Sequence, residues 1–125
     1  PYAAVIPLFL KSAKNKKQPI IYGDGLTSRD FTFVENVVQA NIRAMFTNID
    51  DRKHDVFNIA CGNSITLNSL WKSISKLYKV EYIYPIYKEE RPGDIKHSFA
   101  DISKAKSLIN YYPKIDLIKG LKLLY

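Results

Sequence analysis

The sequence predicts a small α/β protein, which is α+β when it stands alone. Segments with the apolar spacing of amphipathic helices alternate with short runs of β-branched and aromatic residues. Hydrophobic residues make up 46% of the 125 residues and aromatic residues 13%, which favours a folded core over a disordered chain. A chain of this length is one small domain or part of a larger one. The alternation favours packed layers of helix and strand over a helical bundle or a β-sandwich.

The first elements surround a proline and a glycine-rich turn. Residues 3–13 have helical spacing, and because Pro7 lacks a backbone donor we expect the helix to begin near it or to bend there. Residues 20–22 form a short β-favouring run. The turn Gly23-Asp-Gly25 contains residue types that tolerate a left-handed backbone, so it ends this strand.

The remaining elements follow the same two patterns. Alternating or continuous apolar residues predict strands at residues 29–34, 56–59 and 81–84. Helical spacing predicts helices at residues 35–47, 66–77, 103–108 and from 117 onward. The polar residues expected to cap these helices are Thr66 or Asn68, Asp101 and Ser103, Asn110, and Asp116.

The composition restricts partners and location. The net charge is +7, from 19 Lys and Arg less 12 Asp and Glu, and it leaves open nucleic acid, a phosphate ligand or mere solubility. No apolar stretch approaches the roughly 20 residues that cross a bilayer, and the single cysteine, Cys61, suits a reducing compartment, so we expect a cytoplasmic protein. The chain begins without Met and ends inside an apolar run, so we expect a fragment of a longer polypeptide.

Two stretches carry residues suited to an anionic ligand with an aromatic ring. Tyr22 precedes the glycine turn and Arg29 follows it; an aromatic face can stack on a base, and a guanidinium can grip two phosphate oxygens. The alternative is that Arg29 pairs with Asp30 or Asp24. In the second stretch, the turn Arg91-Pro-Gly-Asp94 holds a cation three residues from a carboxylate that suits vicinal hydroxyls, or it is an ordinary charged turn.

The order of the motifs resembles one enzyme family. The motifs are Pro19-Ile-Ile-Tyr-Gly-Asp-Gly25, Ser28-Arg-Asp-Phe31, Val34-Glu-Asn-Val37, Phe57-Asn-Ile-Ala60, Arg91-Pro-Gly-Asp-Ile-Lys-His-Ser98 and Ala100-Asp-Ile-Ser-Lys104. Their combination resembles the C-terminal part of extended short-chain dehydrogenase/reductase nucleotide-sugar epimerases, and more closely the branch acting on UDP-N-acetylhexosamines and their uronic acids. The resemblance covers nearly the whole chain, 1–125, as a UDP-binding domain.

The resemblance implies a role for eight residues. Ala4 and Val5 match backbone beside UDP, Tyr22 the aromatic beside uracil, Arg29 and Arg91 the pair that clamps the diphosphate, Asp94 the carboxylate on the ribose, and Ile65 a packing contact. Ser98 matches a gatekeeper beside the sugar, where a small side chain admits an N-acetyl group. Phe31 stands where plain UDP-glucose epimerases often have tyrosine, which fits the N-acetyl branch.

The resemblance also implies parts that this sequence does not contain. The family binds NAD through a Gly-x-x-Gly-x-x-Gly loop of a Rossmann domain and abstracts a proton with a tyrosine that has a lysine four residues later. Only Tyr84 has a lysine, Lys88, four residues later. Pro85 lies between them and breaks the helix that such a pair requires. We therefore expect no catalytic residue here, an inactive isolated chain, and a full-length parent that is a homodimeric NAD-dependent 4-epimerase for surface polysaccharide synthesis.

Other readings of the sequence stay open. A 4,6-dehydratase or a decarboxylase of the same superfamily fits the same motifs, and a basic nucleic-acid-binding module is the second alternative. His54, His97 and Cys61 lack metal-ligand spacing, so no metal site is expected, and Cys61 is interpreted as a small buried apolar residue.

Overall fold

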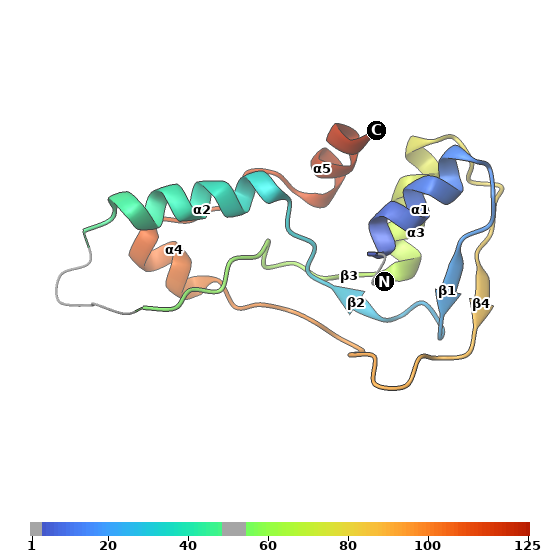
Figure 1. Cartoon of the computed structure of the whole chain (residues 1–125), viewed down its shortest axis with the longest axis horizontal. Helices are drawn as coiled ribbons and strands as arrows, with labels where there is room; N and C mark the ends of the chain where they lie inside the picture. Colours follow the sequence, from blue (N-terminus) through green and yellow to red (C-terminus); the bar gives the residue numbers. More distant parts are fainter. Residues whose placement is uncertain (1–3, 49–54) are drawn as a thin grey trace. The chain divides into compact units, whose positions relative to one another are not determined.

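In a computed structural model the chain forms two compact units, and the structure describes residues 4–48 and 55–125. The first unit comprises Pro1–Arg29 and Ile65–His97, and the second comprises Asp30–Ser64 and Ser98–Tyr125. Both consist of helices and short strands or extended loops, which confirms the predicted mixed class (Figure 1). His54 lies outside the described residues.

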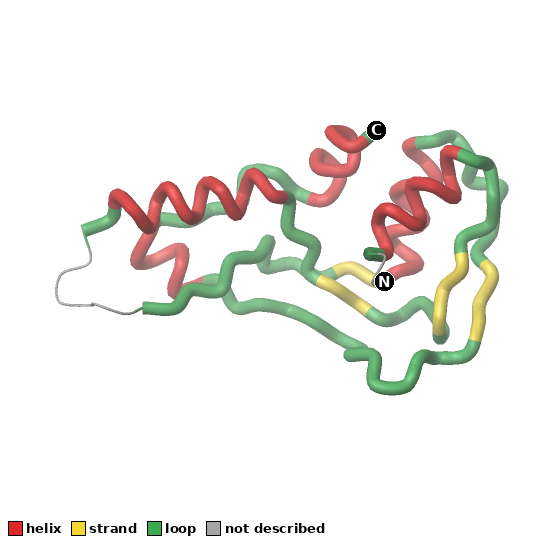
Figure 2. Tube along the Cα trace, viewed as in Figure 1, coloured by secondary structure: helices red, strands yellow, loops and turns green. Residues whose placement is uncertain are grey.

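The first unit packs two helices beside two small sheets (Figure 2). Its elements are α1 (Val5–Lys14), β1 (Ile20–Tyr22), β2 (Ser28–Arg29), β3 (Ile65–Thr66), α3 (Leu67–Leu77) and β4 (Ile86–Lys88). β1 pairs with β4 in parallel, with Ile21 opposite Tyr87, and β2 pairs with β3 in antiparallel. Each sheet therefore joins segments that are far apart in the sequence.

The core of the first unit lies between α1 and α3. Phe9 meets the edge of Trp71 with ring centroids 5.7 Å apart and an interplanar angle of 82°, a favourable aromatic geometry. The Trp71 indole donates a hydrogen bond to the Ile83 carbonyl at 2.9 Å, so its one polar group is satisfied although the residue is buried. This contact fixes α3 and the chain before β4 to each other.

Local signals set the helix ends of the first unit. α1 begins two residues before Pro7, which sits in the first turn, where a helix tolerates a missing N–H. Thr66 caps α3, because its hydroxyl accepts from the Ser69 N–H at 3.2 Å. Both outcomes confirm the sequence-based expectation.

In the described part of the second unit the helices are α2 (Val34–Phe46), α4 (Ser103–Ile109) and α5 (Leu117–Leu124). A cluster of buried side chains, which we call the unit 2 core, consists of Ala40, Ala60, Ile102, Ala105, Ile109 and Tyr111. The Tyr111 hydroxyl donates to the Ala60 carbonyl at 2.8 Å, and burial raises its pKa to about 12. As expected, Asp116 caps α5 and Asn110 ends α4 in a left-handed conformation.

Asn36 on α2 joins α2 to the segment before α5. Its side chain is 2% exposed, donates to the Ile115 carbonyl at 2.7 Å, and accepts from the backbone N–H groups of Lys114 and Ile115. Every polar atom of this buried amide therefore has a partner, as burial requires.

Two of the three remaining strand predictions fail inside the second unit. The strand predicted at residues 29–34 ends at Arg29, because the Asp30 carboxylate turns to accept from the backbone N–H groups of Cys61 and Gly62 at 3.0 and 2.9 Å. Residues 56–59 form no ladder among the described residues; instead Phe57 and Ile59 pack on the unit 2 core. Cys61 is half-buried, and desolvation raises the pKa of its thiol.

The strand predicted at residues 81–84 is wrong as well. Residues 81–82 form a turn, in which the Ile83 N–H donates to the Val80 carbonyl at 2.9 Å. The strand starts only after Pro85, as β4, because Pro19 and β1 offer a partner there: the Ile86 N–H donates to the Pro19 carbonyl. None of the helices in the described part of the chain has the length and apolarity of a membrane-spanning segment.

Candidate functional site

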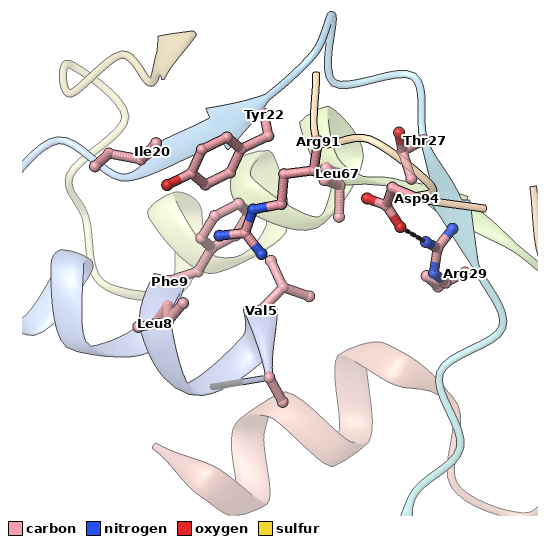
Figure 3. Close-up of a pocket in the computed structure, with 11 residues that line it drawn as sticks. Val5, Leu8, Phe9, Ile20, Tyr22, Thr27, Arg29, Leu67, Arg91 and Asp94 are labelled. Carbon is pink, nitrogen blue, oxygen red and sulfur yellow. Dashed lines mark hydrogen bonds and ion pairs between the residues drawn. The ribbon is translucent and has the colours of Figure 1, made fainter. Parts of the chain in front are cut away.

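A pocket of about 380 Å³ opens in the first unit (Figure 3). Its lining comes from α1, β1, β2, the start of α3 and the turn after β4, and consists of Ala4, Val5, Leu8, Phe9, Ile20, Tyr22, Thr27, Arg29, Leu67, Arg91 and Asp94. The volume lies within the range of small-molecule sites, and the lining combines apolar walls with a few charged groups, as such sites do. Six of the eight residues singled out in the sequence line this one pocket.

The N-terminal end of α1 forms one wall of the pocket. Ala4 occupies the N-cap position and its methyl group offers no acceptor to the first turn, which also contains no acidic residue. Backbone N–H groups at a helix N-terminus lack intrahelical partners and carry a partial positive charge. The wall at Ala4 and Val5 therefore favours an anion.

Tyr22 is placed by a tightly built turn. The Asn68 side chain donates to the Asp24 carbonyl at 3.1 Å, and its backbone N–H donates to the Gly25 carbonyl at 3.1 Å. Gly25 has φ +75°, and a Cβ there would come within 2.1 Å of the Asn68 Oδ1. The turn thus requires glycine at this position, and Asn68, expected only as a possible cap, is the residue that anchors it.

Arg29 and Asp94 form an ion pair at the pocket. The Arg29 Nη2 lies 2.6 Å from the Asp94 Oδ1, and the Arg29 Nη1 donates to the Ser28 carbonyl at 2.8 Å. The alternative expectation that Arg29 pairs with Asp30 or Asp24 is wrong, because both of those carboxylates bind backbone N–H groups instead.

Arg91 lies against Tyr22 inside the pocket. Its guanidinium carbon is 3.8 Å from the centre of the Tyr22 ring, the geometry of a cation–π contact. Hydrogen bonding to the Arg91 guanidinium, and then its charge, lower the pKa of the Tyr22 hydroxyl. The turn expected at residues 91–94 is present: the Asp94 N–H donates to the Arg91 carbonyl at 3.2 Å, and Gly93 has φ +77°.

The segment after this turn is held against β2. The Ser28 N–H donates to the Lys96 carbonyl at 2.9 Å, and the Ser28 hydroxyl lies 3.0 Å from the His97 Nδ1. These contacts keep the turn that carries Arg91 and Asp94 beside the strand that carries Arg29. Sequence reasoning missed these contacts, because Ser28 and His97 are 69 residues apart and their two motifs do not indicate that they pair.

Two of the eight residues do not line the pocket. Ile65 stands opposite Arg29 in the pairing of β2 with β3, so it neighbours the site through the backbone. Ser98 is exposed and is the first residue of the second unit's C-terminal segment. Its relation to the pocket stays a prediction.

Neither a glycine-rich dinucleotide loop in the sequence nor a metal-binding cluster among the described residues is found. Its five glycines do not form a Gly-x-x-Gly-x-x-Gly loop, so no residue here is assigned to NAD. Among residues 4–48 and 55–125, no cluster of three His, Cys, Asp or Glu side chains is suited to a metal ion. Tyr84 and Lys88 share no helix, since Lys88 lies in β4 and Tyr84 precedes it.

Comparison with known proteins identifies relatives over almost all of the chain. The UDP-N-acetylglucosamine 4-epimerase of Methanobrevibacter ruminantium M1, solved with UDP-N-acetylmuramic acid, is 41% identical with a TM-score of 0.85, over 99% of this chain and 40% of that one. The UDP-glucose 4-epimerase of Thermotoga maritima, solved with UDP-glucose, is 35% identical with a TM-score of 0.88, over 98% and 38%. The UDP-N-acetyl-alpha-D-glucosaminuronate decarboxylase of Bacillus cytotoxicus is 31% identical over 98% of this chain and 39% of its own length.

The chain thus spans only part of its relatives, 34% to 39% of the length of the first three curated ones. The model of the NAD dependent epimerase/dehydratase family matches residues 2–60. Together with the alignments along nearly the whole chain, this match shows that the chain belongs to the NAD dependent epimerase/dehydratase family.

Proposed function

We propose that the first unit binds the nucleoside diphosphate of a UDP-sugar, as the substrate-holding part of an NAD-dependent 4-epimerase. The proposal rests on one observation. Arg29 and Asp94 are 65 residues apart in the sequence but meet in one pocket, which Arg91 and Tyr22 also line. Charged groups from separate segments rarely gather around an open pocket for stability alone, because exposed ion pairs contribute little.

Each group has a role that suits its chemistry. Arg29 and Arg91 supply planar donors for diphosphate oxygens, with the N-terminus of α1 adding backbone donors. Tyr22 supplies a flat face for uracil, and Asp94 accepts from two ribose hydroxyls. In this role the chain positions the sugar for chemistry and makes or breaks no bond itself.

The proposed substrate is UDP-N-acetylhexosamine or the corresponding uronic acid. Ser98 is the residue assigned to the N-acetyl group, and the 41% identity with a UDP-N-acetylglucosamine 4-epimerase supports this substrate class. A decarboxylase acting on an N-acetylated uronic acid is the second candidate, because a relative with that activity aligns with 98% of the chain. Epimerisation and decarboxylation share the nucleotide and differ at the sugar.

The rest of the catalytic cycle is assigned to residues other than these. We propose that NAD, the catalytic tyrosine and its lysine belong to a Rossmann domain of the same enzyme, that residues 1–125 are its nucleotide-sugar-binding domain, and that the enzyme is a cytoplasmic homodimer serving polysaccharide synthesis. The isolated chain is then inactive as an epimerase.

Calorimetric titration of the chain tests the proposal. UDP is expected to bind with one site per chain, UMP more weakly because it lacks the second phosphate, and a random single-stranded DNA only weakly at physiological salt. Binding of the DNA with a steep dependence on salt, and no heat with UDP, would refute nucleotide-sugar binding in favour of a basic nucleic-acid module.

A further inference from the structure

The Tyr22 ring has a partner within the chain. The Arg91 guanidinium lies 3.8 Å from the ring centre, and Figure 3 shows its side chain reaching into the pocket between Tyr22 and the side chains of α1. The face that would stack on a base is therefore covered by one of the groups assigned to the diphosphate.

Asp94 is engaged in the same way. Its carboxylate holds the Arg29 guanidinium at 2.6 Å, so the group assigned to the ribose is paired with a group assigned to the diphosphate. Arg91 thus pairs with Tyr22, and Arg29 pairs with Asp94, so each of the four groups assigned to the ligand has a partner within the chain. A ligand that uses all four groups replaces both pairs.

Arg91 is free to make such an exchange. It belongs to an exposed turn, and a Cβ built on the neighbouring Gly93 would meet no atom within 4 Å. The guanidinium can leave Tyr22 without disturbing the core of the unit, which lies between α1 and α3.

We propose that Arg91 is a specificity-determining residue, which covers Tyr22 in the free chain and favours a ligand that carries both a base and a diphosphate over a ligand that carries only one of them. This inference rests on the proposed UDP-binding function. Arg91 acts by competing with the base for the same aromatic face.

The selectivity depends on whether a ligand replaces the interactions that Arg91 and Tyr22 lose when they separate. A nucleoside takes the Tyr22 face but gives the released guanidinium no anion, so it loses the cation–π contact without replacement. A sugar phosphate offers an anion but no ring to replace the cation on Tyr22. A nucleoside diphosphate supplies both, and it binds with each displaced group satisfied.

The test compares uridine and UDP on the chain and on Arg91→Ala, by calorimetry or by competition. Removing the guanidinium should weaken UDP at least about ten-fold, because charge-assisted hydrogen bonds are lost. The same change should strengthen uridine about two- to five-fold, the range expected for an exposed cation–π contact. Lys72→Ala, which removes an exposed charge outside the pocket lining, should change neither affinity.

The outcomes separate this inference from the proposed function. If the unmodified chain binds no UDP, the proposed function fails and this inference with it. If the chain binds UDP but Arg91→Ala weakens uridine or leaves it unchanged, only the role of Arg91 as a cover is refuted.

A second measurement observes the contact between Arg91 and Tyr22 directly in the unmodified chain. The Arg91 side-chain protons, lying over a ring face, should show upfield NMR shifts in the free chain that are lost on addition of UDP and kept on addition of inorganic phosphate. Shifts at ordinary values in the free chain would overturn the proposal. A Tyr22→Leu variant assigns the effect, because it should abolish the upfield shifts.

Discussion

Arg29 and Asp94 are more informative about function than about stability. Their side chains are 28% and 38% exposed, and exposed ion pairs typically contribute about 0–1 kcal/mol. Such a pair does not explain why the chain brings two distant segments together, since the contacts of Ser28 with Lys96 and His97 already do so. The pair therefore supports the proposed role of both side chains in ligand binding.

Replacing Asp94 by Ala should weaken UDP but leave the fold intact. In the proposed complex the carboxylate accepts from the ribose hydroxyls, so the loss should be about ten-fold for UDP and near zero for its 2′,3′-dideoxy analogue. Calorimetry with both ligands measures this difference. Equal losses for the two nucleotides would show that Asp94 acts through Arg29 rather than on the ribose.

Replacing Ser98 by Tyr tests the substrate assignment in the complete enzyme. A bulky side chain beside the sugar should lower kcat/KM for the N-acetylated UDP-sugar at least about ten-fold relative to UDP-glucose or its uronic acid, because pocket size sets such discrimination. Product analysis by NMR gives the ratio. Unchanged selectivity would remove Ser98 from the sugar site.

The turn between β1 and β2 is the element that most tightly constrains the site. Gly25 is buried against Asn68, and the Tyr87 hydroxyl donates to the Asn68 Oδ1 at 2.9 Å. The turn, α3 and β4 are thus linked through one amide side chain. The position of Tyr22 depends on this link, since Tyr22 directly precedes the turn.

Gly25→Ala and Gly93→Ala separate backbone strain from steric conflict. Both glycines have positive φ, but a Cβ at Gly25 meets Asn68 whereas one at Gly93 meets nothing within 4 Å. We expect Gly93→Ala to cost about 1 kcal/mol of unfolding free energy and Gly25→Ala clearly more. Urea unfolding measures both, and equal costs would show that Asn68 gives way without resistance.

Helices were predictable from the sequence and most strands were not, for a physical reason. α1, α2, α3, α4 and α5 lie within a few residues of their expected ranges, because helical spacing and caps such as Thr66 and Asp116 are local. A strand requires a partner elsewhere. Residues 30–34, 56–59 and 81–84 have strand-like composition but lack a partner strand among the described residues. Residues 20–22 form a strand as predicted, because β4 is their partner.

At the scale of the molecule, each unit has a core of its own. Phe9 and Trp71 centre the first, and Tyr111 anchors the second by its hydrogen bond to Ala60. Because the pKa of Tyr111 is raised to about 12 by burial, the unfolded chain loses this proton at a lower pH than the folded chain does. Its contribution to stability is therefore complete below pH 10 and falls between about pH 10 and 12.

Tyr111→Phe should abolish that part of the pH dependence. At neutral pH the variant loses one buried hydrogen bond and about 1 kcal/mol of unfolding free energy. Above pH 10 the gap to the unmodified protein should narrow, since phenylalanine has no proton to lose. Denaturant unfolding at pH 7 and pH 11 measures the gap, and a constant difference would contradict the assignment.

The site was predictable in its parts but not in its assembly. Tyr22, Arg29, Arg91 and Asp94 were recognised from their chemistry and from the resemblance to nucleotide-sugar epimerases. That they share a pocket follows from the parallel pairing of β1 with β4 and from the Ser28–His97 contact, which no local pattern encodes. The hydrogen bond by which Asn68 anchors the turn after Tyr22, and the contact of Arg91 with the Tyr22 ring, could be found only from the structure.

NMR titration of the ¹⁵N-labelled chain with UDP shows whether this pocket holds the nucleotide. We expect saturable shifts of the amides of Val5, Tyr22, Arg29, Arg91 and Asp94, all of which line the pocket, and little change at Asn36 and Asp116 in the second unit. Shifts that do not saturate, or that follow the exposed lysines instead of the pocket, would contradict this expectation.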